Sequence, residues 1–454
     1  MFGSSTAVTT EAPVRLKAAD GGSPLAAPIT VTDSIAMWIE ELSRLEGTSK
    51  KECIDSIGAL EDLKAAAAAA QARFAADYDS RQRHDQSALG MPKKEQGKGI
   101  AGEIALARRV SPNQGNQHLG FSKALVNEMP HTLKALTAGK VSEWRATLLV
   151  KETACLTVED RAEVDHQLAS DQNYLQGLSD RRLTAEARKA SYQLDPQSVV
   201  RRAAKATNER TVTGRPAPDA MAYVTALLPA SQGVAVLAAL TRAANGPRAE
   251  GDQRGRGQFM ADTFVERITG QSQADATAVD VQLVMTDRTL LAGDGEPAFL
   301  PGYGVIPAQV GRDLARQGTA AAEAWIRRLY TAPVSGQLVG MDSRSRLFPK
   351  GLSRFIATRD QICGTPWCDA PIRHTDHVVP WSAGGQTNES NGRGLCEACN
   401  YAKEAPGWTV QAAPDPPDTG PVRDSRYTTK TSTPTGHVYW FTAPSLPGAT
   451  PAKA

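Results

Sequence analysis

The chain has 454 residues, of which 41% are hydrophobic, and its formal net charge is +2. This length suffices for two or three domains with hydrophobic cores, and the small net charge excludes a strong overall positive field as the basis for binding nucleic acid. The alanine-rich run at residues 65–70 is far shorter than the roughly 20 apolar residues of a transmembrane helix. The first thirty residues lack the basic start and apolar core of a signal peptide. We therefore expect a cytoplasmic protein with no membrane contact.

The N-terminal two thirds of the sequence have mostly helical patterning. Residues 1–30 mix Ser, Thr, Pro and Gly with scattered charges, and we expect them to be disordered. Apolar residues then recur at helical spacing from about residue 35 to 76, and again over residues 101–210. The polar stretch between them, residues 79–99, is typical of a linker or a long loop. These patterns predict a helical bundle.

The pattern changes after residue 220. Residues 221–229 and 279–287 have strand-like composition, and the segments 233–244 and 259–270 between them have helical spacing. We therefore predict a mostly helical domain over residues 31–330 that contains a small mixed α/β element. The segments 320–330 and 347–363 also have helical character, and the second of these leads directly into Cys363. Residues 411–454 predict a Pro-rich loop, a short strand at 436–443 and a tail.

Four of the six cysteines are clustered near the C-terminus. Cys363 and Cys368 are separated by four residues, and Cys396 and Cys399 by two. Two pairs with such spacing can hold one tetrahedral Zn²⁺ in a closed structural site. Disulfide bonds are the competing interpretation, although reduced thiols are expected in the cytoplasm. A zinc site would also stabilise a short, glycine-rich module that has little core of its own.

The segment between the two cysteine pairs carries polar residues that a purely structural zinc knuckle does not need. Asp376 and His377 lie on a predicted strand, Gly384 and Gly385 form a turn, and Asn391 lies in the polar loop that follows. Asn400 comes directly after Cys399 on a helix predicted from about residue 395 to 403. Since adjacent helical residues point about 100° apart, Cys399 can face zinc while Asn400 faces a second site.

These residues resemble the HNH endonucleases, which share the ββα-metal fold. The motif of that family is Asp-His, then Asn, then His or Asn, and here His377, Asn391 and Asn400 are spaced 14 and 9 residues apart. Upstream, "EIALARRVSP" and "LVMTDRTLLAGDGEPAFLPGYGVIP" are similar to an actinobacterial family in which a long helical domain of unknown function precedes the HNH module. The fold is thus expected to be mainly α, with a zinc-stabilised ββα-metal module at residues 331–410.

The resemblance implies a role for each residue of the motif. His377 would be the general base, Asp376 and Asn400 would hold Mg²⁺ or another divalent cation, and Asn391 would brace the loop that orients His377. Histidine suits the role of base because its unperturbed pKa is about 6.5. An Asn at the last motif position is an oxygen donor, which favours magnesium or manganese over a softer metal. The implied substrate is nucleic acid, with double-stranded DNA as the expected form.

Alternation along the strand raises a geometric question. Successive strand residues face opposite sides, so Asp376 and His377 need a twist or bulge if both are to address one phosphate. His374, three residues before His377, is a candidate third polar ligand or an exposed strand residue. Five basic residues are candidates for phosphate contacts or for a mixed solvated surface: Arg354, Arg359, Arg373, Arg393 and Lys403.

Three functions are compatible with these features. The first is a metal-dependent DNA endonuclease with a structural zinc. The second is a zinc-stabilised nucleic-acid-binding protein without catalysis. In the third, the helical region acts as a protein-interaction scaffold, with possible self-association, and the module is a passenger.

Overall fold

The computed structural model describes residues 30–47, 49–246, 252–270, 283–320, 342–343, 347–413 and 426–448. The N-terminal segment expected to be disordered, apart from residue 30, and most of the helix predicted at 320–330 lie outside these residues. The chain divides into two compact units, residues 1–60 and 61–454. None of the described helices combines the length and the apolar character needed to cross a bilayer.

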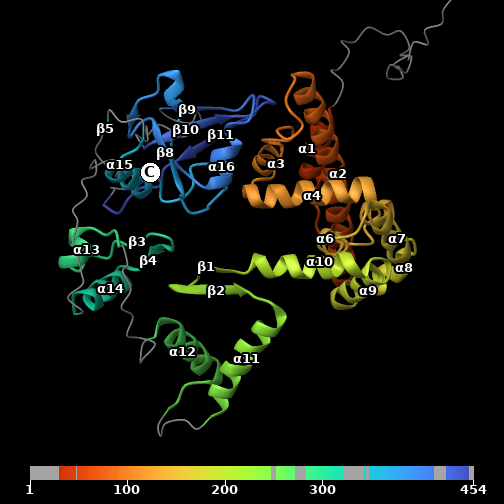
Figure 1. Cartoon of the computed structure of the whole chain (residues 1–454), viewed down its shortest axis with the longest axis horizontal. Coiled ribbons are helices and arrows are strands. Elements are labelled where there is room, and N and C mark those ends of the chain that lie inside the picture. Colours follow the sequence, from red (N-terminus) through yellow and green to blue (C-terminus); the bar gives the residue numbers. More distant parts are fainter. Residues whose placement is uncertain are drawn as a thin grey trace, which may run out of the picture. The chain divides into compact units, whose positions relative to one another are not determined.

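Helices dominate the described chain up to residue 320 (Figure 1). The helices before residue 210 are α1 (Val31–Leu42), α2 (Lys50–Ala88), α3 (Ile100–Arg108), α4 (Pro112–Glu128), α5 (Pro130–Thr137), α6 (Glu143–Glu152), α7 (Val158–Ala169), α8 (Gln172–Gly177), α9 (Asp180–Leu194), α10 (Pro196–Ala206) and the 3-10 helix η1 (Thr207–Glu209). The later helices are α11 (Ala230–Asn245), α12 (Arg256–Thr269), α13 (Asp287–Leu291), α14 (Ala308–Ala320), α15 (Lys350–Asp360), the 3-10 helix η2 (Trp381–Ala383) and α16 (Glu397–Ala402).

Strands form small antiparallel sheets. They are β1 (Thr211–Ala217), β2 (Met221–Leu227), β3 (Ala298–Leu300), β4 (Gly304–Ile306), β5 (Asp342–Ser343), β6 (His374–His377), β7 (Thr387–Asn388), β8 (Gly392–Leu395), β9 (Thr409–Ala413), β10 (Thr428–Ser432) and β11 (Val438–Thr442). The pairs are β1 with β2, β3 with β4, β5 with β7 and β6 with β8, and the one larger sheet of the described chain has the order β11-β10-β9.

The polar stretch 79–99 was predicted as a linker or loop, and this is wrong for its first half because α2 continues to Ala88. Asp79 explains the continuation. Its side chain is buried, accepts hydrogen bonds from Arg83 one helical turn later, and lies 3.0 Å from the ammonium of Lys123 on α4. Polar residues here pair with one another inside the bundle, so composition alone misrepresents their environment.

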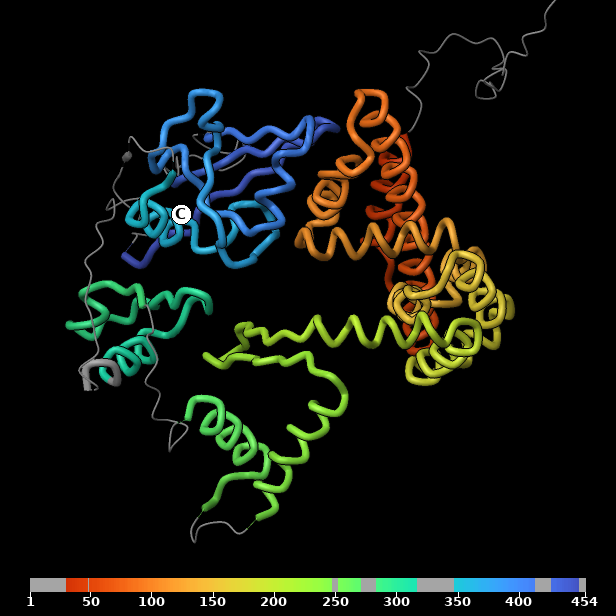
Figure 2. Tube along the Cα trace, in the orientation of Figure 1, coloured from red at the N-terminus to blue at the C-terminus, as the bar shows by residue number. Residues whose placement is uncertain are grey.

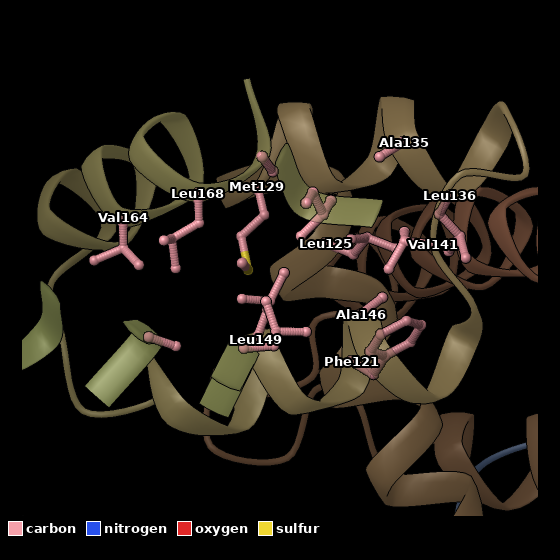
Figure 3. Packing of buried hydrophobic residues seen from close by; sticks show 14 of the residues in the cluster. Phe121, Leu125, Met129, Ala135, Leu136, Val141, Ala146, Leu149, Val164 and Leu168 are labelled. Carbon is pink, nitrogen blue, oxygen red and sulfur yellow. The ribbon is translucent and has the colours of Figure 1, made fainter. Parts of the chain in front are cut away.

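The predicted helical bundle is confirmed, and its core is built mainly from α2 and α4 to α9. The alanine-rich run of α2 buries Ala65, Ala68, Ala69 and Ala72, which share one face of the helix at i, i+3, i+4 and i+7. Small side chains on that face allow close approach of the neighbouring helices, and Figure 3 shows larger side chains of the same core, among them Leu125, Met129 and Leu149.

A buried carboxylate caps one helix of this bundle. The N-cap residue of α5, Met129, has no side chain that can accept a hydrogen bond, so the first N–H groups of α5 need another partner. Asp165 of α7 supplies it: its carboxylate accepts from the backbone N–H groups of His131 and Thr132 at 2.7 and 2.9 Å. Asp165 is only 1% exposed, so α7 contributes a charge-assisted cap to the start of α5.

The mixed α/β element is present in part as predicted. Strand β2 and helices α11 and α12 occur where the sequence indicated them. Much of the second predicted strand, at 279–287, lies outside the described residues. Its described end contains a single bridge, Val284 to Phe299, and the start of α13.

The C-terminal module, here residues 347–413 and 426–448, holds the predicted ββα unit and a further sheet. Its chain runs from α15 through the β6–β8 hairpin to α16 and then to β9, β10 and β11 (Figure 2, cyan to blue). The predicted strand at His374–His377 and the helix after Cys396 are confirmed. The strand predicted at 436–443 is present as β11, and the sequence analysis missed β10, which pairs with β11 on one side and with β9 on the other. Strand β10 consists of threonines, a lysine and a serine, so its apolar pattern is too weak to reveal it.

Candidate active site and metal centre

The four clustered cysteines converge in the C-terminal module. Cys363 and Cys368 follow α15, Cys396 is the N-cap of α16, and Cys399 lies on its first turn. All four are buried, and their sulfurs lie within 4.8 Å of one another. The Cys368 Sγ atom is 3.6 Å from that of Cys396 and 3.7 Å from that of Cys399. A tetrahedral zinc with Zn–S bonds of about 2.3 Å separates its sulfurs by about 3.8 Å, so this geometry fits the ion.

The four thiols also affect one another's pKa values. Hydrogen bonds from Cys368, Cys396 and Cys399 lower the pKa of the Cys363 thiol, while bonding to Cys363 raises the pKa of each of the other three thiols. A divalent cation at the centre of these sulfurs would stabilise the thiolate form of all four cysteines. The six cysteines are all free, so the described structure contains no disulfide.

The β6–β8 hairpin carries Asp376 and His377 in regular antiparallel register. Asp376 pairs with Arg393 and His377 with Gly392, one residue to one, without a bulge. Regular alternation places the two side chains on opposite faces of β6. The twist that would bring both to one side is therefore not found in this strand.

The His377 face of the hairpin packs toward α15. A Cβ atom on Gly392 would lie 2.4 Å from Ile356 Cδ1, so glycine is required for β8 to approach that helix. His377 is buried, its ring centroid lies 4.5 Å from that of Phe348, and its Nε2 is 2.9 Å from Thr387 Oγ1. Trp381 lies beside it, with centroids 6.2 Å apart. Thr387 was not predicted, because a threonine in a polar loop gives no distinct signal.

Asn391 ties together the loop between β6 and β8. Its Nδ2 donates to the carbonyl oxygens of Val379 and Gln386 at 3.1 and 2.8 Å, and its Oδ1 accepts from the N–H of Val379 at 2.8 Å. Its backbone carbonyl also accepts from the N–H of Val378, directly after His377. The side chain therefore uses both ends of its amide to hold the strand that carries His377.

The opposite face of β6 contacts α16. Lys403 Nζ lies 2.6 Å from the Oδ2 atom of Asp376, and Asn400 Nδ2 lies 2.9 Å from the Nδ1 atom of His374. Asp376 Oδ2 is buried, and the Lys403 ammonium is its charged partner. The carboxylate of Asp376 on β6 and the amide oxygen of Asn400 on α16 are ligand types suited to a hard divalent cation. Asp376 and Asn400 thus lie at the same interface, between β6 and α16. The histidine at this interface is His374, not His377.

Two of the five basic candidates are excluded as phosphate contacts because they are buried. Arg359 is 3% exposed and donates to the Asp360 carboxylate and to the backbone carbonyls of Glu389 and Gly392. Arg393 is 2% exposed and donates to Thr365 Oγ1. Burial of Asp360 raises the pKa of its carboxyl, although both arginines oppose this change. Arg354 and Arg373 are exposed and remain candidates.

Comparison with known proteins assigns both parts of the chain. A family described as "Domain of unknown function (DUF222)" matches residues 58–360, and "HNH endonuclease" matches residues 361–405. An "Uncharacterized protein Rv3776" of Mycobacterium tuberculosis is 26% identical over 365 residues, which cover 69% of this chain and 67% of that protein. No solved structure matches. The predicted resemblance is confirmed: the chain belongs to the DUF222 family and carries an HNH endonuclease domain after it.

Proposed function

We propose that the protein is a metal-dependent endonuclease that hydrolyses phosphodiester bonds in double-stranded DNA. The observation that carries this proposal is the shared strand–helix face of Asp376 and Asn400, beside a cluster of four thiols, within the HNH match. A fold-stabilising site and an oxygen-donor site then lie on one short module. The cysteines would hold the structural zinc, since their spacing matches tetrahedral coordination.

Asp376 and Asn400 would hold a catalytic cation such as Mg²⁺ or Mn²⁺ through a carboxylate oxygen and an amide oxygen. When bound, the cation would offset the negative charge that develops on the scissile phosphate. Lys403 already supplies positive charge to Asp376, and it also pairs with Glu404. If a cation replaced the Lys403 ammonium beside Asp376, the ammonium could still pair with the Glu404 carboxylate.

His377 would act as the general base that takes a proton from the attacking water. The contacts with Thr387 and Phe348 fix its ring, and the amide of Asn391 fixes the backbone that follows it. Such support restricts the imidazole to one orientation, as general-base catalysis requires. Since His377 and Asp376 face opposite sides of β6, the role of His377 needs a direct test against another histidine of the module.

The test is cleavage of supercoiled plasmid by the purified full chain, after its zinc content has been measured. With Mg²⁺ or Mn²⁺ the wild type should nick DNA, and His377→Ala should abolish nicking while DNA retention stays nearly unchanged. His437→Ala is the matched control, because His437 is an exposed histidine of the same module. A zinc-loaded wild type that binds DNA but cuts none with magnesium, manganese or nickel would support the binding protein without catalysis instead.

Self-association through the helical region is also part of the proposal. Helix α1 buries none of its residues, and Trp38 and Ile39 are 61% and 63% exposed. Exposed apolar side chains of this size favour contact with another surface. Sedimentation of the wild type and of a Trp38→Glu variant tests the idea, and a wild type that remains monomeric at all concentrations would contradict it.

A further inference from the structure

Strand β6 and helix α16 contact each other through two pairs of side chains. His374 and Asp376 are two residues apart on one strand, so their side chains share a face. Asn400 and Lys403 are three residues apart at α16 and share a face of the helix. His374 contacts Asn400 and Asp376 contacts Lys403, so strand and helix meet in register over both pairs.

The first pair determines which end of the Asn400 amide is available. The Nδ2 group of asparagine can only donate, so the His374 Nδ1 atom that lies 2.9 Å away must accept. The two ends of a carboxamide have nearly the same shape, and an amide without a partner can present either end. With Nδ2 held by the imidazole, Oδ1 points away from His374 and is left for another ligand.

We propose that His374 is a positioning residue for metal binding: by accepting a hydrogen bond from Asn400 Nδ2, it directs Asn400 Oδ1 to the cation that Asp376 shares. The inference rests on the proposed function, since it concerns the same cation. It adds a histidine outside the HNH motif residues, and it requires the neutral His374 tautomer with its proton on Nε2. The Tyr401 ring, edge-on to His374 with centroids 6.4 Å apart, helps to fix the imidazole plane.

Mn²⁺ binding to the zinc-loaded full chain, measured as free Mn²⁺ by electron paramagnetic resonance, tests the inference. His374→Leu removes the acceptor and should weaken Mn²⁺ binding roughly 10-fold to 100-fold, the range for second-shell partners of metal ligands. His374→Asn places an amide oxygen near the position of Nδ1, and it should restore affinity to within about 3-fold of the wild type. Zinc content and far-ultraviolet circular dichroism should stay unchanged in both variants.

A double mutant separates positioning from direct ligation. If His374 acts through Asn400, adding His374→Leu to Asn400→Ala should cause no further loss of Mn²⁺ affinity. A further loss would make His374 a ligand in its own right and overturn the inference. Unchanged Mn²⁺ affinity in His374→Leu would also overturn it, while an Asp376→Ala variant that loses affinity would show that the proposed metal site itself stands.

The tautomer gives a readout that needs no catalytic metal. In protein labelled with ¹⁵N-histidine, the His374 signals, identified by their absence in His374→Asn, should show a protonated Nε2 and an unprotonated Nδ1. A protonated Nδ1 would refute the inference whether or not the protein binds Mn²⁺. A wild type that binds no Mn²⁺ but shows the expected tautomer would refute the metal-dependent function, and with it the metal-directing role of His374.

Discussion

Replacing Asn391 by alanine should loosen the loop between β6 and β8. The change removes three side-chain hydrogen bonds, with donor–acceptor distances of 2.8, 2.8 and 3.1 Å. A net contribution of about 1 kcal/mol for each bond gives a local destabilisation of about 2 to 4 kcal/mol. Opening of this loop should therefore become roughly 30-fold to 1000-fold more frequent.

Hydrogen–deuterium exchange of peptides that span residues 378–391 measures this opening, and plasmid cleavage measures its effect on function. The amide of Val379 should exchange faster and cleavage should fall, while zinc content stays at the wild-type level. Asn391→Asp should be at least as damaging, because its carboxylate would face the carbonyl oxygens of Val379 and Gln386. Ser390→Ala is the control, since Ser390 is exposed and makes one bond, to Asn388.

Two results would refute this reasoning. If exchange and cleavage are unchanged in Asn391→Ala, the amide does not hold the loop. If Asn391→Asp behaves like the wild type, the two bonds donated by Nδ2 contribute nothing. Faster exchange with full cleavage would show that the loop is braced but that catalysis does not depend on it.

Three further predictions concern the metal, the alkaline limit and the helical bundle. Cys396→Ser keeps a good N-cap for α16 but removes one thiolate, so zinc content should fall well below one ion per chain, and unaltered zinc would contradict the four-cysteine site. Burial raises the pKa of Tyr427 from 10.0 to about 12, so the folded state binds this proton more tightly. The contribution of this group to stability should be intact below pH 10 and be lost as pH rises from 10 to beyond 12, by about 3 kcal/mol in all, a loss that Tyr427→Phe should lack in urea unfolding. Asp165→Ala should lower the free energy of unfolding of the bundle by about 2 kcal/mol or more by leaving the start of α5 uncapped, and an unchanged denaturation midpoint would show that water replaces the cap.

Features encoded in short stretches of sequence were predictable. Spacing alone indicated that Cys363, Cys368, Cys396 and Cys399 would meet, because each pair is close in the chain. The polar strand with Asp376 and the helix after Cys396 were identified for the same reason. Such local motifs depend little on what the rest of the chain does.

Features that depend on packing between distant segments were not predictable. The burial of Arg359 follows from carbonyl groups about thirty residues later, and nothing in the basic helix itself distinguishes it from the exposed Arg354. The contact of His374 with Asn400 depends on the register between a strand and a helix 26 residues apart in sequence. The alternation of side chains along a strand did predict that Asp376 and His377 would face opposite sides of it. It did not predict that Asp376 would face α16 and His377 would face α15.

Helix α15 determines where the HNH domain can be separated from the DUF222 domain before it. The DUF222 match includes this helix and the HNH match begins at residue 361, yet Arg359 holds the carbonyls of Glu389 and Gly392 on either side of Asn391. A fragment cut at the family boundary would lose that anchor and expose a groove where Ile356 had packed against Gly392. Recombination that transferred the HNH domain to another protein would thus have to carry the last helix of the DUF222 match with it.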